Sequence, residues 1–277
     1  MTELVTTLAG LRAALAPWRD GPIAMVPTMG ALHDGHLSLV HEAARHAPRT
    51  VVSIFVNPTQ FAPHEDFDAY PRTLEADMAR LDGSADIVFA PSPAEMYPRG
   101  FATLVSVGGP SQGLESDFRP HFFAGVATVV AKLLLAAMPD VAVFGEKDYQ
   151  QLLVVRRLAA DLGLVTRIVG APTLREADGL AMSSRNAYLD PRERTIAAQM
   201  NRILKDVIAR AAGGDLHGAE DEGRAALLDA GFDKVDYVAI RDAASLAPVR
   251  DLSRPARVLA AAHLGRTRLI DNMPVNV

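Results

Sequence analysis

Short runs of apolar, mostly β-branched residues alternate with helical patterns through the first two thirds of this chain. The predicted strands lie at residues 23–28, 50–56, 87–90, 104–107, 141–144 and 165–169. Their consecutive apolar residues are typical of parallel strands covered on both faces. The helical patterns between them lie near residues 35–47, 72–82, 122–137 and 148–162. This alternation predicts a doubly wound, Rossmann-like α/β domain, whose ligands bind at the carboxyl ends of the strands.

The pattern changes after about residue 171. Residues 172–179 form a polar, turn-rich link, and Asp190 followed by Pro191 marks the start of a helix, as an N-cap and a first-turn proline. Two further helical stretches flank Gly213-Gly214, and strand-like runs follow at residues 235–240, 257–264 and 267–270. We therefore expect two domains: a nucleotide- and substrate-binding domain at 1–171 and a smaller α+β lid domain at 172–277.

Composition removes several classes of function. The net charge of −5 over 277 residues argues against a broad surface for nucleic acid or an acidic membrane. The chain has no cysteine, which excludes disulfides, thiolate nucleophiles and cysteine-based metal centres. The longest apolar stretch, residues 126–138, contains Thr128 and Lys132 and is too short to span a bilayer. The first residues do not resemble a signal peptide, so we expect a cytoplasmic protein.

The chemically most informative motif is His33-Asp34-Gly35-His36, which follows the predicted strand at 23–28 and a Met29-Gly30 turn. The order strand, glycine turn, helix puts two imidazoles and unpartnered N–H groups at a helix N-terminus, where phosphate binds well. Two histidines three residues apart could also bind a metal, but a third ligand is not evident. The motif therefore favours a site that acts on a nucleotide phosphate.

Two further polar segments could contact the same phosphates. Lys147 and Asp148 follow the strand at 141–144, where a lysine can reach a phosphate and an aspartate can hold a ribose hydroxyl. The alternative is that Asp148 only caps the next helix. Met182-Ser183-Ser184-Arg185 lies in the interdomain link and could close over a triphosphate, or form a simple turn.

Neutral amides follow the second predicted strand. Asn57 and Gln60 suit a small hydroxy acid, although Asn57-Pro58 is also a common way to open a turn. The chain contains no Gly-x-Gly-x-x-Gly after a strand, no Walker-type P-loop and no His-Glu-x-x-His. A dinucleotide oxidoreductase and a P-loop enzyme are therefore not expected.

Taken together, these segments resemble a known family. The turn at residues 29–36 resembles the His-x-Gly-His signature of the nucleotidylyltransferase superfamily, and residues 182–185 resemble its second phosphate-binding loop. More specific strings resemble the pantoate–β-alanine ligase family, in order across about residues 20–190. These strings are Val26-Pro27-Thr28-Met29-Gly30, Phe55-Val56-Asn57-Pro58-Thr59-Gln60-Phe61, Tyr70-Pro71-Arg72-Thr73, Gly125-Val126-Ala127-Thr128-Val129-Val130, Phe144-Gly145-Glu146-Lys147-Asp148-Tyr149-Gln150-Gln151 and Ser183-Ser184-Arg185-Asn186.

The resemblance implies an ATP-dependent ligase that joins pantoate to β-alanine through a pantoyl adenylate, with release of pyrophosphate and AMP. It also implies Mg²⁺ bound with ATP and a homodimer. No nucleic acid or membrane partner is expected.

The resemblance also implies a role for each matching residue. The expected catalytic residues are His36, His33, Lys147 and Arg185. The expected ATP contacts are Met29, Gly30, Ala31, Leu32, His33, Asp34, Gly35, His36, Gly145, Glu146, Lys147, Asp148, Leu174, Met182, Ser183, Ser184 and Arg185. Gln60 is expected to contact pantoate and β-alanine, and Gln151 to contact pantoate. Asn57 is also expected to bind substrate, and Asp77 is expected to be an outer contact to magnesium.

One segment departs from the family pattern, and two rival functions remain. The family commonly reads Arg-Pro-Gly-His-Phe where this chain reads Arg119-Pro120-His121-Phe122-Phe123, so the role of that histidine is not carried over. One rival is a nucleotidylyltransferase acting on a phosphorylated alcohol or a nicotinamide nucleotide. The other is a non-catalytic nucleotide-binding module.

Overall fold

The chain divides into two compact units. The computed structural model describes residues 2–63 and 65–275. The first unit comprises Met1–Glu146 and Val154–Pro172, and the second comprises Lys147–Leu153 and Thr173–Val277. The predicted boundary at 171/172 lies beside this division. The roles assigned to the two ranges stay predictions.

Residues 147–153 lie with the second unit, whereas the sequence placed them in the first domain. Two hydrogen bonds explain the difference. The Tyr149 hydroxyl donates to the Ala243 carbonyl at 2.8 Å, and Asn272 Nδ2 donates to the Lys147 carbonyl at 2.8 Å. These contacts join residues far apart in the sequence, so local patterns do not reveal them.

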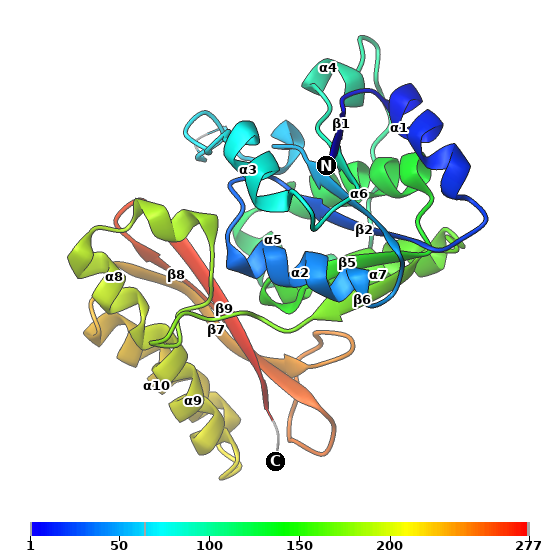
Figure 1. Ribbon diagram of the computed structural model, residues 1–277. Coiled ribbons are helices and arrows are strands. Elements are labelled where there is room, and N and C mark those ends of the chain that lie inside the picture. Colours follow the sequence, from blue (N-terminus) through cyan, green and yellow to red (C-terminus); the bar gives the residue numbers. More distant parts are fainter. Residues whose placement is uncertain (1, 64, 276–277) are drawn as a thin grey trace. The chain divides into compact units, whose positions relative to one another are not determined.

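The first unit is built on a six-stranded parallel sheet (Figure 1). In spatial order its strands are β1 (Glu3–Val5), β4 (Ile87–Phe89), β3 (Arg49–Ile54), β2 (Ile23–Thr28), β5 (Val141–Gly145) and β6 (Arg167–Ala171). The chain moves outward from β2 to β3 and β4, and then returns to β5 on the other side of β2. The order therefore reverses between β2 and β5, and α/β sheets bind ligands at the carboxyl ends of the strands at such a point.

Helices cover this sheet on both faces, which confirms the predicted doubly wound α/β fold. The helices of this unit are α1 (Leu8–Leu15), α2 (Asp34–Ala44), α3 (Leu74–Leu81), α4 (Pro93–Met96), α5 (Glu115–Phe118), α6 (Phe122–Ala137) and the end of α7 (Tyr149–Asp161), with 3-10 turns η1 (Ala16–Trp18), η2 (Pro58–Gln60) and η3 (Gly109–Ser111). The turn η4 (Glu146–Asp148) is divided between the two units. Val40 of α2 and Leu81 of α3 pack with Val26 and Val52 on one face. Alternate residues of β2, such as Met25, point to the opposite face, where α6 contacts the strand.

The predicted and observed strands differ in two places. Residues 104–107 are expected to form a strand, but they have no regular secondary structure and lie outside the sheets. The Val105 N–H donates to Thr128 Oγ1 at 2.9 Å instead of to a neighbouring strand, and Leu104 is 68% exposed. The short edge strand β1 was not predicted, because three residues carry too little pattern. The prediction at 104–107 is wrong because strand formation requires a partner backbone, which side-chain composition does not supply.

The second unit is a smaller α+β structure, as predicted. Its elements are η5 (Ser184–Tyr188), α8 (Pro191–Ala197), α9 (Gln199–Ala211), α10 (Leu216–Asp229) and the antiparallel strands β7 (Lys234–Asp242), β8 (Ala256–Leu264) and β9 (Thr267–Val275). Asp190 caps α8 in a reciprocal capping box with Glu193, as its sequence suggested. A Cβ on Gly223 of α10 would lie 2.5 Å from a methyl of Val207, so α9 and α10 approach closely only because this residue is glycine.

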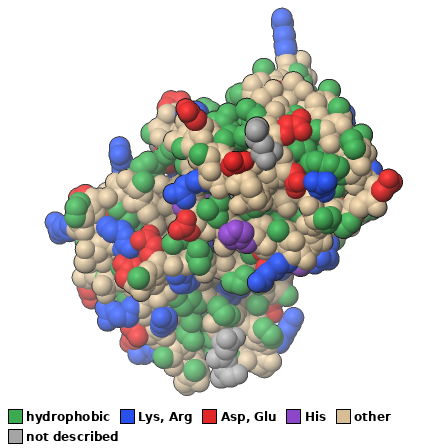
Figure 2. Space-filling model, viewed as in Figure 1, with side chains coloured by type: hydrophobic (Ala, Val, Ile, Leu, Met, Phe, Trp, Pro, Cys, Tyr) green, Lys and Arg blue, Asp and Glu red, His purple; other side chains and the backbone are tan. Residues whose placement is uncertain are grey.

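Two observations concern membrane-spanning helices and surface charge. Within residues 2–63 and 65–275, no helix is both long and apolar enough to cross a bilayer. On the face shown in Figure 2, basic and acidic side chains are interspersed rather than gathered by sign.

Candidate active site

The two histidines of the signature motif lie at the amino end of α2 and cap it reciprocally. His33 Nδ1 accepts a hydrogen bond from the Gly35 N–H at 3.1 Å, and His36 Nδ1 accepts one from the His33 N–H at 3.3 Å. The ring centroids are 4.1 Å apart. A ring nitrogen that accepts an N–H bond carries no proton, so in the neutral ring the proton lies on Nε2. Both rings therefore bring an Nε2–H donor to the same turn.

The turn that joins β2 to α2 is held by a carboxylate from α3. Gly30 and Ala31 have left-handed φ values of +84° and +50°. Asp77 accepts the Ala31 N–H at 3.0 Å and the Leu32 N–H at 2.8 Å. With the two caps, the N–H groups of residues 31, 32, 33 and 35 all have partners inside the protein. The expectation of free N–H groups here is wrong for these four, because partly buried backbone donors must be satisfied. The imidazoles are thus the distinctive donors of this turn.

The predicted substrate amides form a buried cluster next to the same turn. Gln60, which is 8% exposed, donates from Nε2 to Met29 Sδ at 3.0 Å and accepts from Asn57 Nδ2 at 3.0 Å. Asn57 Nδ2 also donates to the Gly125 carbonyl at 3.2 Å, and Asn57 Oδ1 accepts the Tyr97 hydroxyl at 2.7 Å. Asn57 is only 1% exposed, and these contacts hold Gln60 in place. The structure thus brings Gln60 and Met29 together within the first unit.

Close packing of α6 against η2 fixes this cluster. A Cβ on Gly125 would lie 2.3 Å from the Thr59 carbonyl oxygen, so only glycine permits the contact. Tyr97 was not identified from the sequence, where nothing links it to Asn57 40 residues earlier. Burial raises the pKa of the Tyr97 hydroxyl, and its hydrogen bond with Thr59 offsets this only in part. The hydroxyl therefore stays protonated and keeps donating to Asn57 over a wider pH range.

Arg119 is a second residue that sequence reasoning did not assign to the site. Its guanidinium donates to both Glu65 carboxylate oxygens at 2.6 Å, to Glu115 Oε1 at 3.0 Å and to the Gln60 carbonyl at 3.0 Å. It also lies 4.0 Å from the centroid of the Phe122 ring. Phe122 stands where the family pattern has a histidine, and here it stacks on the arginine that holds Gln60.

The residues that follow β5 are divided between the two units. Gly145 ends β5 and pairs with Ala171 of β6, so it lies at the carboxyl edge of the sheet, followed by Glu146. Lys147 and Asp148 belong to the second unit, where Lys147 Nζ lies 3.7 Å from Asp148 Oδ1. Gln151, on the first turn of α7, is half-buried.

The second predicted phosphate-binding segment forms a compact loop in the second unit. Ser183 Oγ accepts the Arg185 N–H at 3.3 Å and caps η5, which begins at Ser184. The Met182 N–H donates to the Leu174 carbonyl at 3.0 Å. The two apolar residues expected at adenine are therefore direct neighbours, although eight positions separate them in sequence.

Ion pairs hold this loop in its conformation. Arg194 contacts Glu176 at 2.6 Å and Asp178 at 2.7 Å, and Glu176 also accepts from Asn186 Nδ2 at 3.0 Å. The Arg194 hydrogen bond lowers the pKa of the Asp178 carboxyl, which is the stronger effect, while slight burial opposes it. Arg175 forms a bidentate pair with Asp271, at 2.7 and 2.9 Å. The sequence did not identify Arg175, because its partner Asp271 is 96 residues away. It did not identify Arg194 either, because no motif links this arginine to Glu176 and Asp178.

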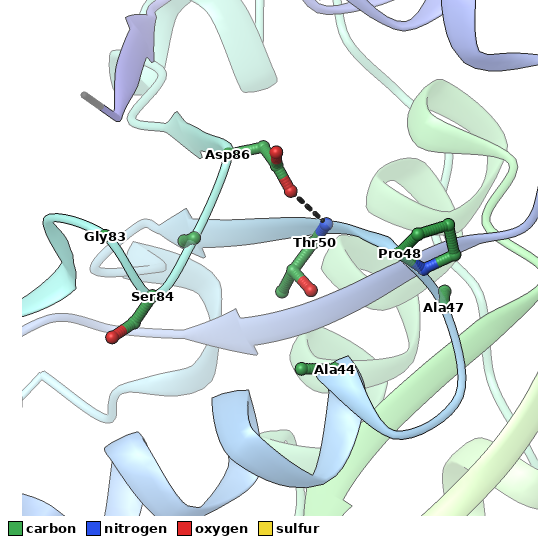
Figure 3. Close-up of a pocket in the computed structure, with 8 residues that line it drawn as sticks. Ala44, Ala47, Pro48, Thr50, Gly83, Ser84 and Asp86 are labelled. Atoms are coloured by element: carbon green, nitrogen blue, oxygen red, sulfur yellow. Dashed lines mark hydrogen bonds between the residues drawn. The ribbon is translucent and has the colours of Figure 1, made fainter.

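A separate hollow of about 380 Å³ lies away from these residues. It is lined by Ala44, Ala47, Pro48, Thr50, Gly83, Ser84, Ala85 and Asp86, at the amino ends of β3 and β4 (Figure 3). The Asp86 carboxylate there accepts hydrogen bonds from the Thr50 N–H at 2.8 Å and from the Arg49 guanidinium at 2.9 Å. The imidazoles and amides instead follow the carboxyl ends of β2 and β3, where ligands of α/β sheets bind.

Comparison with known proteins identifies the family of this chain. The family model for pantoate–β-alanine ligase matches residues 3–274. A pantothenate synthetase of Mesorhizobium japonicum is 61% identical over 279 residues, covering 99% of this chain and 98% of the relative. The same enzyme of Paramagnetospirillum magneticum is 58% identical, with 99% and 98% covered.

Solved structures agree with the family model. The pantothenate synthetase of Thermus thermophilus has a TM-score of 0.94 at 48% identity, with 99% of both chains covered. A pantoate–β-alanine ligase from Francisella tularensis, solved with "Beta-gamma ATP" and β-alanine, has a TM-score of 0.85 at 32% identity, covering 99% of this chain and 97% of the other. From its signature turn, its sheet order and these matches over its full length, the chain belongs to the pantoate–β-alanine ligase family.

Proposed function

We propose specific roles for the residues above in the reaction of this family, the ATP-dependent joining of pantoate to β-alanine. In the first step, a carboxylate oxygen of pantoate attacks the α-phosphorus of ATP in line. The bond from that phosphorus to the bridging oxygen breaks, and the products are pantoyl adenylate and pyrophosphate. A carboxylate is a poor nucleophile toward a polyanion, so the site must orient it and stabilise the charge that develops on the phosphoryl oxygens.

The observation that carries this proposal is the reciprocal cap of His33 and His36. It assigns the proton of each neutral ring to Nε2 and holds the ring centroids 4.1 Å apart. Two N–H donors held together by the backbone suit neighbouring oxygens of one phosphoryl group, and they need no rearrangement during reaction. We therefore assign His36 as the main donor to the α-phosphoryl group, with His33 beside it and Met29, Gly30, Ala31, Leu32, Asp34 and Gly35 forming the turn.

Gln60 is proposed to hold pantoate, and β-alanine in the second step. Its side-chain amide donates to Met29, the first residue of the histidine turn, and accepts a hydrogen bond from Asn57. A carboxylate bound at Gln60 would therefore lie near the turn that carries the donors. Gln151 is proposed as a further pantoate contact.

The remaining proposed ATP contacts are the other residues that match the family's motifs. Lys147, Ser183, Ser184 and Arg185 would bind the phosphates, Gly145 and Asp148 would lie at the ribose, and Glu146 would be a further ATP contact. Leu174 and Met182, which are hydrogen-bonded neighbours, would lie against adenine. The Francisella relative solved with an ATP compound and β-alanine supports nucleotide and amine substrates for this fold.

In the second step the amine of β-alanine attacks the acyl carbon of the adenylate. The bond from that carbon to the AMP oxygen breaks, the nitrogen loses a proton, and AMP leaves as the amide forms. Magnesium enters this proposal as part of the Mg–ATP substrate, and no cluster of three potential metal ligands exists among the described residues. The homodimer and the cytoplasmic location stay predictions.

A substrate panel tests the proposal. Purified protein is given Mg–ATP with pantoate alone, with a phosphorylated alcohol, or with nicotinamide mononucleotide, and pyrophosphate release is measured. We expect pyrophosphate only with pantoate, and AMP only when β-alanine is added. Release with a phosphorylated substrate and not with pantoate would overturn the proposal, as would tight ATP binding without turnover.

A further inference from the structure

We infer that Asp77 is a positioning residue that holds the turn on which the two signature histidines depend. The inference rests on the roles proposed above for His33 and His36. Asp77 lies on the first turn of α3, more than 40 residues after the histidines in sequence, and it does not need to touch substrate to act in this way.

The contacts of Asp77 are those of a buried brace. Its side chain is 2% exposed. Oδ2 accepts the Ala31 N–H at 3.0 Å, and Oδ1 accepts the Leu32 N–H at 2.8 Å. Thr73 Oγ1 donates to Oδ2 at 3.3 Å, and thus orients the carboxylate from its own helix. Each oxygen is therefore bonded to a different backbone donor of the turn.

The turn needs such a brace because its backbone is unusual. Gly30 and Ala31 both have left-handed φ values, and Ala31 carries a side chain that disfavours this conformation. A Cβ on Gly30 would lie 3.0 Å from Asp77 Oδ2 and 3.0 Å from Ile54 Cγ2. The carboxylate thus approaches the backbone closely only because residue 30 is glycine, and its two hydrogen bonds favour the strained conformation.

Displacement of the turn would be transmitted directly to both histidines. Leu32 precedes His33, and the His33 N–H is the donor that orients the His36 ring. A shift of Leu32 therefore moves one imidazole and releases the cap that fixes the other. Misplacement of a reacting group by about 1 Å can cost on the order of a hundredfold in rate. We accordingly expect Asp77 to influence the rate of adenylation more than the affinity for ATP.

The competing role for Asp77 is an outer contact to the magnesium of Mg–ATP. The two roles predict different responses. A brace affects turnover and the exchange of the turn amides, whereas a metal contact affects the concentration of magnesium needed for half-maximal activity. The geometry favours the brace, because both oxygens already accept backbone N–H groups.

The test compares Asp77→Asn with a matched change at the other end of the same helix. Asparagine keeps the shape but replaces one acceptor oxygen with an NH₂ group, which faces a donor. Asp82→Asn is the control, because Asp82 is the same residue type at the C-cap of α3 and accepts the Thr2 N–H at 3.2 Å. For both variants we would measure turnover, KM for ATP, the half-saturating magnesium concentration, amide exchange at residues 30–32 and thermal stability.

For Asp77→Asn we expect turnover to fall by about tenfold to a hundredfold, with KM for ATP and the magnesium requirement little changed and faster exchange at Ala31 and Leu32. Asp82→Asn should leave all of these near wild type. Unchanged turnover, or unchanged exchange, would overturn the inference. A raised magnesium requirement with unchanged exchange would assign Asp77 to the metal instead.

A measurement on the unmodified protein covers the case in which Asp77→Asn does not fold. The Ala31 and Leu32 amides should exchange slowly, as expected for donors bonded to a buried carboxylate. Exchange at the rate of exposed loop amides would overturn the inference. If these amides are protected but His36→Ala retains full turnover, the brace stands and the proposed role of the histidines fails.

Discussion

The two loops proposed to bind ATP are held in place by different physical means. In the first unit, the turn at residues 29–36 is held by hydrogen bonds among backbone N–H groups, imidazoles and the buried Asp77. In the second unit, the loop at residues 173–190 is held by ion pairs. At Arg194 and its partners Glu176 and Asp178, the side chains are 28%, 32% and 45% exposed.

This difference predicts different sensitivities. Hydrogen bonds to a buried carboxylate are little affected by salt, whereas exposed ion pairs are screened over about 8–10 Å at physiological ionic strength. The first loop is thus suited to fixed transition-state donors. The second is suited to a segment that changes conformation as substrate binds.

The largest expected effect is on the fixed loop. For His36→Ala, we expect a loss of about 10²–10³ in turnover, as for removal of one donor to a transition-state oxyanion, with less effect on ATP affinity. Pyrophosphate release and equilibrium ATP binding would be measured. His41→Ala, which removes an exposed histidine from the same helix, is the control. Equal turnover in the two variants would contradict the role of His36.

In the second unit, the most damaging ion-pair change should be Arg175→Ala. It leaves Asp271, whose side chain is 3% exposed, buried without its bidentate partner. We expect a loss of about 2–3 kcal/mol in the free energy of unfolding, below the value for a fully buried pair because Arg175 is 23% exposed. Urea unfolding, with exposed Arg192→Ala as control, measures this. A loss below about 0.5 kcal/mol would contradict this prediction, because it would show that the pair contributes no more than an exposed ion pair.

A pH-dependent effect is expected at Asp236 of β7. Burial raises the pKa of this carboxyl, but Lys234, Arg268 and His263 outweigh it and lower the pKa to about 2. Because the folded pKa is below the unfolded value of about 3.9, the stabilisation is fully present above pH ~4 and is lost as pH falls toward 2. Asp236→Asn should therefore lose about 2 kcal/mol at pH 7.

That difference between Asp236→Asn and wild type should be mostly lost by pH 2 and should disappear below it, as followed by urea unfolding across this range. A difference independent of pH would show that the asparagine acts through packing rather than charge. Asp229→Asn, on the exposed face of α10, is expected to change little.

The smallest expected effect separates the two loops most directly. Arg194→Ala should cost about 0.5–1 kcal/mol of stability and raise KM for ATP by roughly twofold to fivefold, with the wild-type difference shrinking in high salt. Steady-state kinetics at low and high ionic strength measure this. If the effect on KM is independent of salt, the loop is not held by screened ion pairs, and the contrast with the histidine turn fails.

Much of the fold could be predicted from local patterns. The apolar runs that became β2, β3, β4 and β5 are buried on consecutive residues, whereas β6 at the edge of the sheet is mostly half-buried. Asp190 caps α8 as its sequence indicated. The strand expected at 104–107 could not be ruled out locally, since an extended, β-branched segment looks the same whether or not a partner strand lies beside it. The assignment of 147–153 to the second unit depends on Tyr149 and Asn272, which no local pattern connects.

The candidate site divides in the same way. The motif at His33 and His36 was recognisable because a strand, a glycine turn and a helix start leave a local signature. The orientations of its imidazole rings and the partners of its N–H groups could not be predicted from the sequence, because they depend on side-chain positions in the folded protein. Tyr97 and Arg119 were also missed, because their contacts with Asn57 and Gln60 span 40 and 59 residues.

The sequence by itself determined the alternation of strands and helices, the position of the histidine turn and the family. The first two follow from short-range periodicity, capping preferences and motif spacing, and the family follows from the resemblance of the motif strings to those of known members. Only the tertiary structure decided that Asp77 takes up the N–H groups of the turn, that Asn57 holds Gln60, and that residues 147–153 join the second unit. Hydrogen bonds between distant residues depend on where packing brings each side chain, and that is a property of the whole fold rather than of any one segment.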